Sequence, residues 1–428
     1  MEWGVLGPAS LQVERRTRGL ELGGAVRYFN EVAVPGMGGL WFAKPLFLSL
    51  LGIRIAEDSQ VSNIMAANAV EALACCLAFD RNKWERNNRL AGRRKLRGVG
   101  EWTFKVLGRP GTYVPQPMRM ATTSALPALG LVEPGSRRFN AMRLSDTGRS
   151  FLEVASKKYR PHRMDLIDYL RSWREGVEDR VNCGEALASA LSPLEDIPGE
   201  ALAILREQIF GFDTDASRRQ VARRCAIHKW FAVGTGRDWA SCPDCIDPEH
   251  WLDLKAGAGF FAMRDACLTL LDEVERGIGS RSGRFDPATT LEQPIEQALV
   301  DVRQRARTFY DIPQTTTDPN VASARDLAHV LCTGDAKAAL VALVAREGRV
   351  LAMDGALIVP GPVFRGGTSD PAGLPEDQGP EGPPTEEPNS AQEGTLRLPD
   401  LPEGISGRVS NFFWMINDLK LWEGKAHG

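Results

Sequence analysis

Two short pairs of soft metal ligands are the residues of this chain best suited to carry chemistry. Cys225 and His228 form the first pair, Cys242 and Cys245 form the second, and thirteen residues lie between the pairs. Tetrahedral Zn²⁺ sites take four thiolate or imidazole ligands, often as pairs with this spacing. Residues three apart share one face of a helix. The pattern therefore predicts a structural zinc ion that joins a helix to a Cys-Pro-Asp-Cys turn.

The same spacing leaves other interpretations open. Cysteines that happen to lie in a helical core would give this pattern without a metal, and His250 or Cys267 could replace one ligand. A catalytic zinc ion would need an open coordination position and a nearby general base, for which Glu249 is the candidate. A thioredoxin-like redox pair is disfavoured because no βαβ pattern precedes Cys242.

A second pattern overlaps the cysteines. Pro243-Asp244, followed by Asp253-Leu-Lys255, resembles the Pro-Asp…Asp/Glu-x-Lys signature of a large nuclease superfamily. The resemblance implies that the two acids hold Mg²⁺ and that the lysine supports the attacking water. Both acids would have to lie on neighbouring strands. Pro248 and the residues after Lys255 instead favour a loop followed by a helix.

Basic residues dominate the segment from 81 to 97, in which Glu85 is the single acid. Phosphate contacts need clustered Lys and Arg side chains and carry no sequence signature of their own. A solvated helix face, or a surface that docks an acidic protein, would have the same composition. The residues predicted to contact nucleic acid in this segment are Arg81, Lys83, Arg86, Arg89, Arg93, Arg94, Lys95 and Arg97.

The next segment has the order helix, short hairpin, helix. A helix is expected over 116–129, strands over 131–132 and 139–144, and a second helix that begins after Ser145. From about Glu101 to Lys158 this order, with its Leu-Ser-Asp-Thr-Gly end, resembles the winged-helix domains of many bacterial DNA-binding proteins. The resemblance implies base contact by Arg119 and phosphate or minor-groove contact by Arg137 and Arg138. Winged helices also serve in assembly, so docking without DNA stays open.

Apolar residues at helical spacing predict helices through most of the remaining chain. The Asp354-Gly355 pair lies between apolar runs and predicts a hairpin over 349–359, which makes the helices before it a second winged-helix candidate. Helices are expected over 44–51, 59–79, 164–173, 184–191, 198–210, 216–231, 256–277, 291–310, 322–331 and 336–346.

The last part of the chain changes character twice. Residues 364–395 are rich in Pro, Gly, Glu, Asp and Ser, which predicts a disordered acidic linker. The aromatic segment after it predicts a C-terminal helix whose apolar groups are too many to leave in water. We expect this helix to dock on the body of the chain, with binding to a partner as the alternative. Its contact residues would be Phe412, Phe413, Ile416, Leu419 and Trp422.

The composition is that of a globular chain. We expect its fold to be mainly α, with small β elements, as in the α+β class. Of 428 residues 43% are hydrophobic and 25% charged, the net charge is −3, and the eight cysteines are scattered. This excludes a global field that attracts nucleic acid and argues against a secreted disulfide framework. The N-terminus lacks signal-peptide features and residues 40–55 are too interrupted to span a bilayer, so we expect a cytoplasmic protein without a membrane partner.

Six regions are predicted from these patterns. They are an apolar, Gly-rich segment (1–60), a winged-helix domain with the basic segment (61–158), a helical domain with the Cys/His quartet (159–280), a helical domain that ends in the hairpin (281–363), the acidic linker (364–395) and the C-terminal helix (396–428).

The basic segment beside the winged-helix pattern predicts a non-catalytic subunit that binds DNA or scaffolds a bacterial complex acting on DNA. Phage defence or a mobile element would be a fitting setting, with DNA and other protein subunits as partners. Two alternatives stay open. One is a metal-dependent nuclease that uses Asp244, Asp253 and Lys255, and the other is an adaptor whose basic segment meets an acidic protein.

Overall fold

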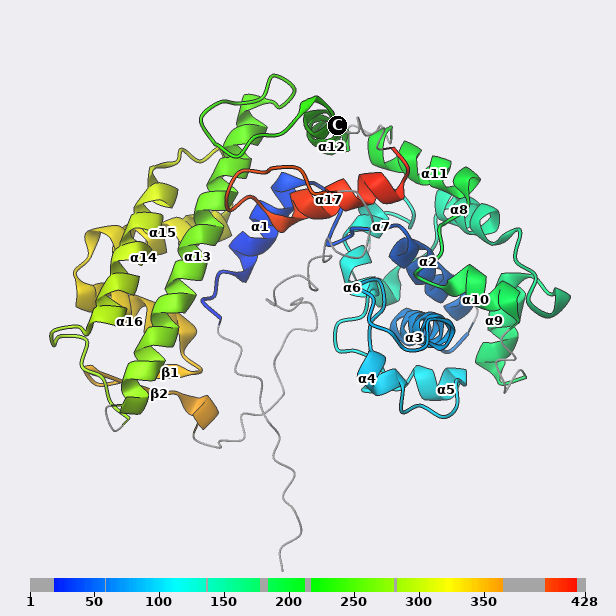
Figure 1. Cartoon of the computed structure of the whole chain (residues 1–428), viewed down its shortest axis with the longest axis horizontal. Helices are drawn as coiled ribbons and strands as arrows, with labels where there is room; N and C mark the ends of the chain where they lie inside the picture. Colours follow the sequence, from blue (N-terminus) through cyan, green and yellow to red (C-terminus); the bar gives the residue numbers. More distant parts are fainter. Residues whose placement is uncertain are drawn as a thin grey trace, which may run out of the picture. The chain divides into compact units, whose positions relative to one another are not determined.

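The computed structural model of the chain is mainly helical, as the sequence predicts (Figure 1). It describes residues 19–57, 59–135, 138–177, 184–211, 217–280, 283–364 and 397–421. The described residues form two compact units. The smaller unit holds residues 19–28 and 256–364, and the larger unit holds residues 29–255 and 397–421, with the gaps given above. The boundaries fall within α1 (Gly23–Ala33) and within α13 (Pro248–Ser280).

The larger unit is built around two buried helices, α2 (Lys44–Ala56) and α3 (Asn63–Arg81). They approach closely at Gly52, where an added Cβ would lie 2.4 Å from Cα of Ala67. Only glycine fits such a contact. The surrounding helices are α4 (Arg93–Leu96), α5 (Phe104–Leu107), α6 (Arg119–Thr122), α7 (Ala125–Ala128), α8 (Asp146–Ser156), α9 (Leu166–Glu175), α10 (Glu185–Leu191), α11 (Gly199–Phe210), α12 (Arg218–Val233) and α17 (Gly407–Asp418).

Helix α3 is the one described helix that is long and apolar enough to cross a membrane. The sequence predicts this helix over 59–79, and it begins at Asn63 because the Ser62 hydroxyl accepts a hydrogen bond from the Met65 amide at 3.2 Å. Within its 18-residue apolar window, 78% of the residues are buried inside the protein. The apolar composition of α3 is therefore explained by its place in the core.

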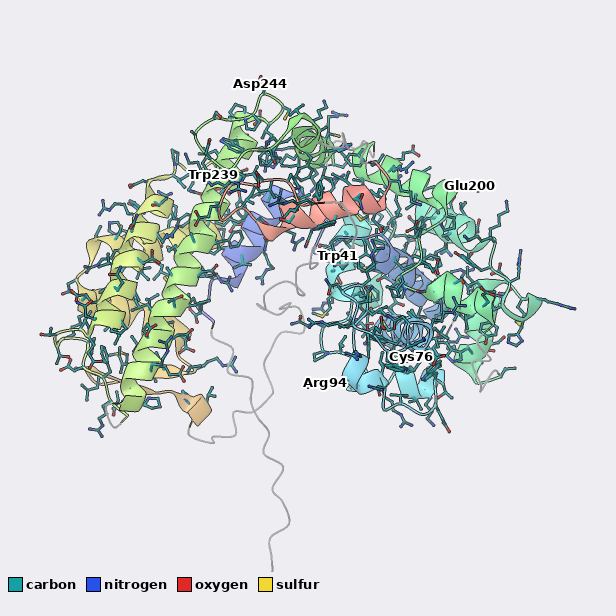
Figure 2. The ribbon with its side chains drawn as sticks, viewed as in Figure 1. Trp41, Cys76, Arg94, Glu200, Trp239 and Asp244 are labelled. Carbon is teal, nitrogen blue, oxygen red and sulfur yellow. The ribbon has the colours of Figure 1, made fainter. Side chains whose placement is uncertain are left out.

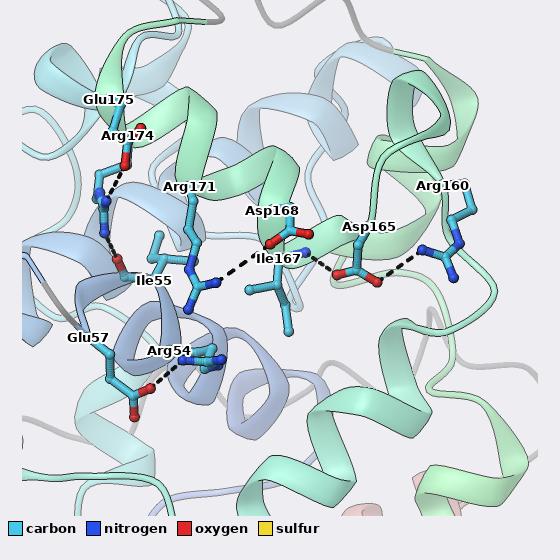
Figure 3. A network of polar contacts seen from close by, with 10 residues as sticks. All are labelled: Arg54, Ile55, Glu57, Arg160, Asp165, Ile167, Asp168, Arg171, Arg174 and Glu175. Atoms are coloured by element: carbon cyan, nitrogen blue, oxygen red, sulfur yellow. Dashed lines mark hydrogen bonds and ion pairs between the residues drawn. The ribbon is translucent and has the colours of Figure 1, made fainter.

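Polar contacts fix α9 at both ends (Figure 3). Asp165 caps its first turn by accepting from the Ile167 amide at 3.0 Å, and it also pairs with Arg160 at 3.2 Å. At the other end, Arg174 donates to the carbonyl of Ile55 in the last turn of α2. Carbonyls at a helix end lack an intrahelical partner, so this contact joins α9 to α2.

The segment that resembles a winged helix differs from its predicted hairpin. The two strands are reduced to a single bridge between Val132 and Leu144, because Phe139–Ala141 forms a 3-10 turn instead of a strand. The carbonyls of Phe139 and Met142 accept from the Asn63 side chain at 3.0 and 2.8 Å. A tertiary contact with α3 has thus replaced the expected strand ladder. The predicted first helix is also divided, into α6 and α7.

The predicted start of the following helix is confirmed. The Ser145 hydroxyl accepts from the Gly148 amide at 3.0 Å at the beginning of α8. A capping bond of this kind spans three residues and depends on local sequence alone, which is why it could be predicted.

The smaller unit has helices followed by a hairpin: α14 (Gln293–Asp311), α15 (Pro319–Thr333), α16 (Ala336–Glu347), β1 (Leu351–Asp354) and β2 (Leu357–Pro360). The two strands are antiparallel and pair Asp354 with Leu357, so the predicted hairpin is confirmed. Gly355 has φ of 59°, as a two-residue hairpin turn requires. Phe285 and Ile358 exchange backbone hydrogen bonds of 2.9 and 2.8 Å and extend this small sheet.

Candidate nucleic-acid interface

The chain leaves α3 through a tight turn that brings the basic segment to the surface of the larger unit. Lys83 and Trp84 adopt left-handed backbone angles, with φ of 58° and 62°. Such angles cost free energy in residues that carry a side chain. The Trp84 ring offsets this cost by stacking on Phe79, with ring centroids 5.2 Å apart. Between this turn and residue 111 the chain forms two short helices, α4 and α5, and both pack on α3. Arg94 marks α4 at the edge of this unit (Figure 2).

Four of the predicted phosphate-binding residues have partners within the chain. Arg81 donates to two acceptors in α10, both at 3.1 Å. Arg89 pairs with Asp418 at 2.9 Å. Lys95 donates to the carbonyls of residues 111 and 113 at 3.0 and 2.9 Å. These three cations hold the basic segment in place. Arg86 is exposed and also has a partner within the chain.

Six other cations of this region are exposed and unpaired. Within the described residues their side chains make no hydrogen bond or ion pair. Lys105 and Arg109 lie beyond the basic segment predicted from the sequence, which ends at residue 97. The basic excess continues to residue 111, and residues 81–111 contain ten basic and two acidic residues. We call this set the α4–α5 surface. It consists of Lys83, Arg93, Arg94, Arg97, Lys105 and Arg109.

A shallow hollow with a volume of about 550 Å³ lies in this surface. Arg94, Arg97, Lys105 and Arg109 each lie within two positions in sequence of a residue that lines the hollow. Three of the lining residues are glycines, so backbone is accessible there. The hollow is lined by Lys95, Gly98, Val99, Gly100, Glu101, Val106, Gly111 and Thr112.

A buried carboxylate of α3 binds the part of the chain that follows the α4–α5 surface. Glu71 of α3 is 2% exposed and accepts from the amides of Met118 and Arg119 at 2.6 and 3.1 Å. The Tyr113 hydroxyl also bonds to it and lies 3.3 Å from the Cys75 thiol. Burial raises the pKa of Glu71 to about 7, although these hydrogen bonds act in the opposite direction. Glu71 thus fixes residues 113–119, which follow the α4–α5 surface in the chain, to the core.

The residues predicted from the winged-helix resemblance do not form a base-reading element. Arg119 is half-buried, its Nε donates to Asn68 at 2.7 Å, and its guanidinium lies over the Phe139 ring. Its helix, α6, has four residues. The polar group of Arg119 is thus directed into the chain in this structure, and base contact by Arg119 stays a prediction. Arg138 is exposed and has a partner within the chain, and Arg137 lies outside the described residues.

The Cys/His quartet is divided between α12 and the loop that contains Asp244 (Figure 2). The Cys225 thiol donates to the Phe210 carbonyl at 3.8 Å, and the Cys242 thiol donates to a carbonyl of its own loop at 3.4 Å. The His228 ring packs on Phe210. In the described part of the chain no three candidate ligands form a group that could hold a metal. The residues as placed do not form a zinc site, and zinc binding stays a prediction.

The residues of the nuclease-like pattern, Asp244, Asp253 and Lys255, do not have the arrangement that the pattern requires. Asp253 and Lys255 lie on α13, which is a helix where the signature requires a strand. Asp253 is 6% exposed and pairs with Arg223 at 2.7 Å, whereas Asp244 is exposed in the loop. The Asp253 carboxylate is thus used in an internal ion pair, and the arrangement does not match two metal-binding acids on neighbouring strands.

The C-terminal aromatic helix packs inside the larger unit. Phe412, Ile416 and Leu419 have no exposed surface and Phe413 is 1% exposed. Ring contacts join Phe412 to Phe210 and Phe413 to Phe231. The expectation that α17 docks on its own chain is confirmed. In this arrangement these residues are not available to a partner; Trp422 and the predicted linker 364–395, apart from its first residue, lie outside the described residues.

A buried polar cluster around residues 31–36 was not predicted. Arg224 has no exposed surface and donates to the carbonyls of Ile209 and Pro35 at 2.7 and 2.9 Å. Its neighbour Arg223 donates to the Val32 carbonyl as well as to Asp253. His250 lies 3.1 Å from the Ala33 carbonyl. Each partner is distant in sequence, so no local pattern could indicate the cluster.

Known proteins add no further information, since no protein-family model, curated protein or solved structure matches the chain. Its function is therefore inferred from its own residues.

Proposed function

We propose that the larger unit binds the phosphates of nucleic acid through the α4–α5 surface and serves as a DNA-binding or scaffold subunit of a complex that acts on DNA. One observation carries this proposal. Six exposed cations lie within 27 residues and no group of the described chain neutralises them. Lys and Arg clusters of this kind bind phosphates by releasing condensed counterions.

The distribution of charge supports the same function. Residues 81–111 carry ten basic and two acidic residues, a net charge of +8, in a chain of net charge −3. The remaining residues therefore carry −11. A polyanion attracts the basic surface of such a chain and is repelled by the net charge of the remaining residues. The chain is therefore oriented by the field so that this surface meets the ligand.

Charge reversal at α4 tests the proposal. The triple change Arg93→Glu, Arg94→Glu and Arg97→Glu should weaken binding to a short labelled DNA duplex by about 100-fold to 1,000-fold at about 0.1 M salt. The slope of log K against log salt should fall by about 3, since each lost phosphate contact contributes nearly one unit. Fluorescence anisotropy across a salt series measures both quantities.

A matched control separates this surface from net charge. Lys157→Glu, Arg163→Glu and Lys229→Glu change the same number of exposed cations elsewhere in the larger unit. We expect this variant to bind within about threefold of wild type, since it removes no phosphate contact. Equal losses in the two variants, or no binding by wild type at low salt, would overturn the proposal. Capture of an acidic protein that survives nuclease treatment and is lost in the α4 variant would favour the adaptor function instead.

A further inference from the structure

We infer that the α4–α5 surface binds double-helical nucleic acid through its backbone alone, with one phosphate seated in the glycine-lined hollow. This inference rests on the proposed function and names its ligand and contact mode. Three features carry it: the inward orientation of the aromatic side chains, the shortness of the helices, and the composition of the hollow.

The aromatic side chains of residues 81–113 all face the core. Trp84 stacks on Phe79, and Phe104 packs edge-on against Trp173 with centroids 5.2 Å apart. Tyr113 is 4% exposed. Trp102 is part-buried against the same core, and its carbonyl accepts from the Trp173 indole at 3.0 Å. Proteins that hold single strands stack bases on exposed aromatic rings. This surface offers cations without such a platform, which favours a ligand whose bases remain paired.

The helices of the surface are too short to read a groove. Direct readout places a helix in the major groove, where several side chains reach base edges. Helices α4 and α5 have four residues each, which is a length of about 6 Å. Their exposed side chains are Lys and Arg, so they contact phosphates and do not discriminate sequences.

A phosphate in the hollow can approach the protein backbone more closely than a phosphate on the surrounding surface. Gly98, Gly100 and Gly111 line the hollow, and Arg94, Arg97, Lys105 and Arg109 lie within two positions in sequence of a lining residue. A Cβ added at Gly100 would meet nothing within 4 Å. The position is therefore open to a ligand oxygen. Glu101 also lines the hollow, and its charge opposes an anion there.

The first experiment compares ligands on the full chain. Two DNA duplexes of unrelated sequence, one RNA duplex and the two single DNA strands are titrated under one salt condition. We expect the DNA duplexes to agree within about threefold and to bind at least about tenfold more tightly than either strand. Binding of either kind of duplex satisfies the inference. Tighter binding of a single strand, or a strong preference for one duplex sequence, overturns it. Absence of binding to every probe would instead overturn the proposed function.

The second experiment fills the hollow. Gly100→Val should weaken duplex binding about fivefold to tenfold, the effect of about one phosphate contact at moderate salt. Gly236→Val is the matched control, because Gly236 is an exposed loop glycine with equally open surroundings. Glu101→Gln should strengthen binding about twofold to fivefold by removing a like charge. Unchanged thermal unfolding would show that both variants fold. Wild-type affinity in Gly100→Val would show that no phosphate binds in the hollow.

Discussion

Arg93-Arg94 and Arg223-Arg224 are the same dipeptide within one unit, and they meet opposite environments. The first pair is exposed, whereas Arg224 has no exposed surface and Arg223 is 8% exposed. The side chains of Arg93 and Arg94 make no polar contact with the described chain, while those of Arg223 and Arg224 together bond to three carbonyls and one carboxylate. A basic pair in a sequence therefore does not indicate a ligand by itself.

The difference follows from the cost of removing a guanidinium from water. That cost is offset only where acceptors are already in place. The turn over residues 32–36 and the end of α11 supply them to the α12 pair, so these arginines contribute to the fold. Within the described residues no acceptor bonds to the side chains of Arg93 and Arg94, so these arginines stay hydrated and available to an external anion. The four predictions below test this contrast, from the largest expected effect to the smallest.

Arg224→Ala should lower the free energy of unfolding of the larger unit by about 3–5 kcal/mol. It leaves the carbonyls of Ile209 and Pro35 buried without a donor, and it also opens a cavity. Arg94→Ala should change stability by less than about 0.5 kcal/mol, as is usual for an exposed side chain. Urea unfolding monitored by tryptophan fluorescence compares the two. Similar losses in both variants would contradict the distinction between the pairs.

Asp253→Asn should destabilise the unit by about 3 kcal/mol, because it leaves the charge of Arg223 buried beside a neutral partner. A double-mutant cycle with Arg223→Met isolates the coupling between the two side chains. We expect the double variant to be more stable than the sum of the single losses predicts. Additive losses would show that the ion pair contributes nothing beyond its packing.

The two regions should respond to pH in opposite directions. Burial, followed by the nearby Arg223 cation, lowers the pKa of His250 to about 4, so its contribution is present above about 6.5 and is lost as pH falls through 4. The raised pKa of Glu71, about 7, gives a contribution that is present below about 4.5 and lost as pH rises through 7. Each shift corresponds to about 3 kcal/mol of unfolding free energy.

Unfolding measured from pH 4 to 8 in Glu71→Gln and His250→Gln separates these contributions. We expect Glu71→Gln to lose stability on acidification more steeply than wild type, because His250 then acts unopposed. In His250→Gln, stability should instead fall as pH rises toward 7. Profiles parallel to that of wild type would mean that neither group titrates in the folded protein as its surroundings imply.

Cys242→Ser should have the smallest effect, a change below about 0.5 kcal/mol, since the thiol donates only to carbonyls of its own loop. Elemental analysis of the purified protein accompanies the unfolding measurement. One equivalent of zinc that is lost in this variant together with a large drop in stability would show that the loop closes on α12. That result would restore the metal site that the sequence predicts.

The sequence by itself determined those features whose causes are local. Ser62 and Ser145 begin helices with bonds that reach three residues, and the Asp354-Gly355 turn pairs strands two residues apart. Apolar spacing likewise predicted most helices, because a buried face repeats with the helical period. Even the docking of α17 followed from composition, since its large apolar groups had to leave water.

Only the tertiary structure decided which polar residues remain available. Arg224 meets Pro35 across 189 positions of sequence, and Arg89 pairs with Asp418 on the last helix. The Cys/His pairs share a spacing typical of zinc sites, and among the described residues no three candidate ligands form a group that could hold a metal. A side chain's function depends on the acceptors and charges that folding brings to it, and these come from segments that no local pattern connects.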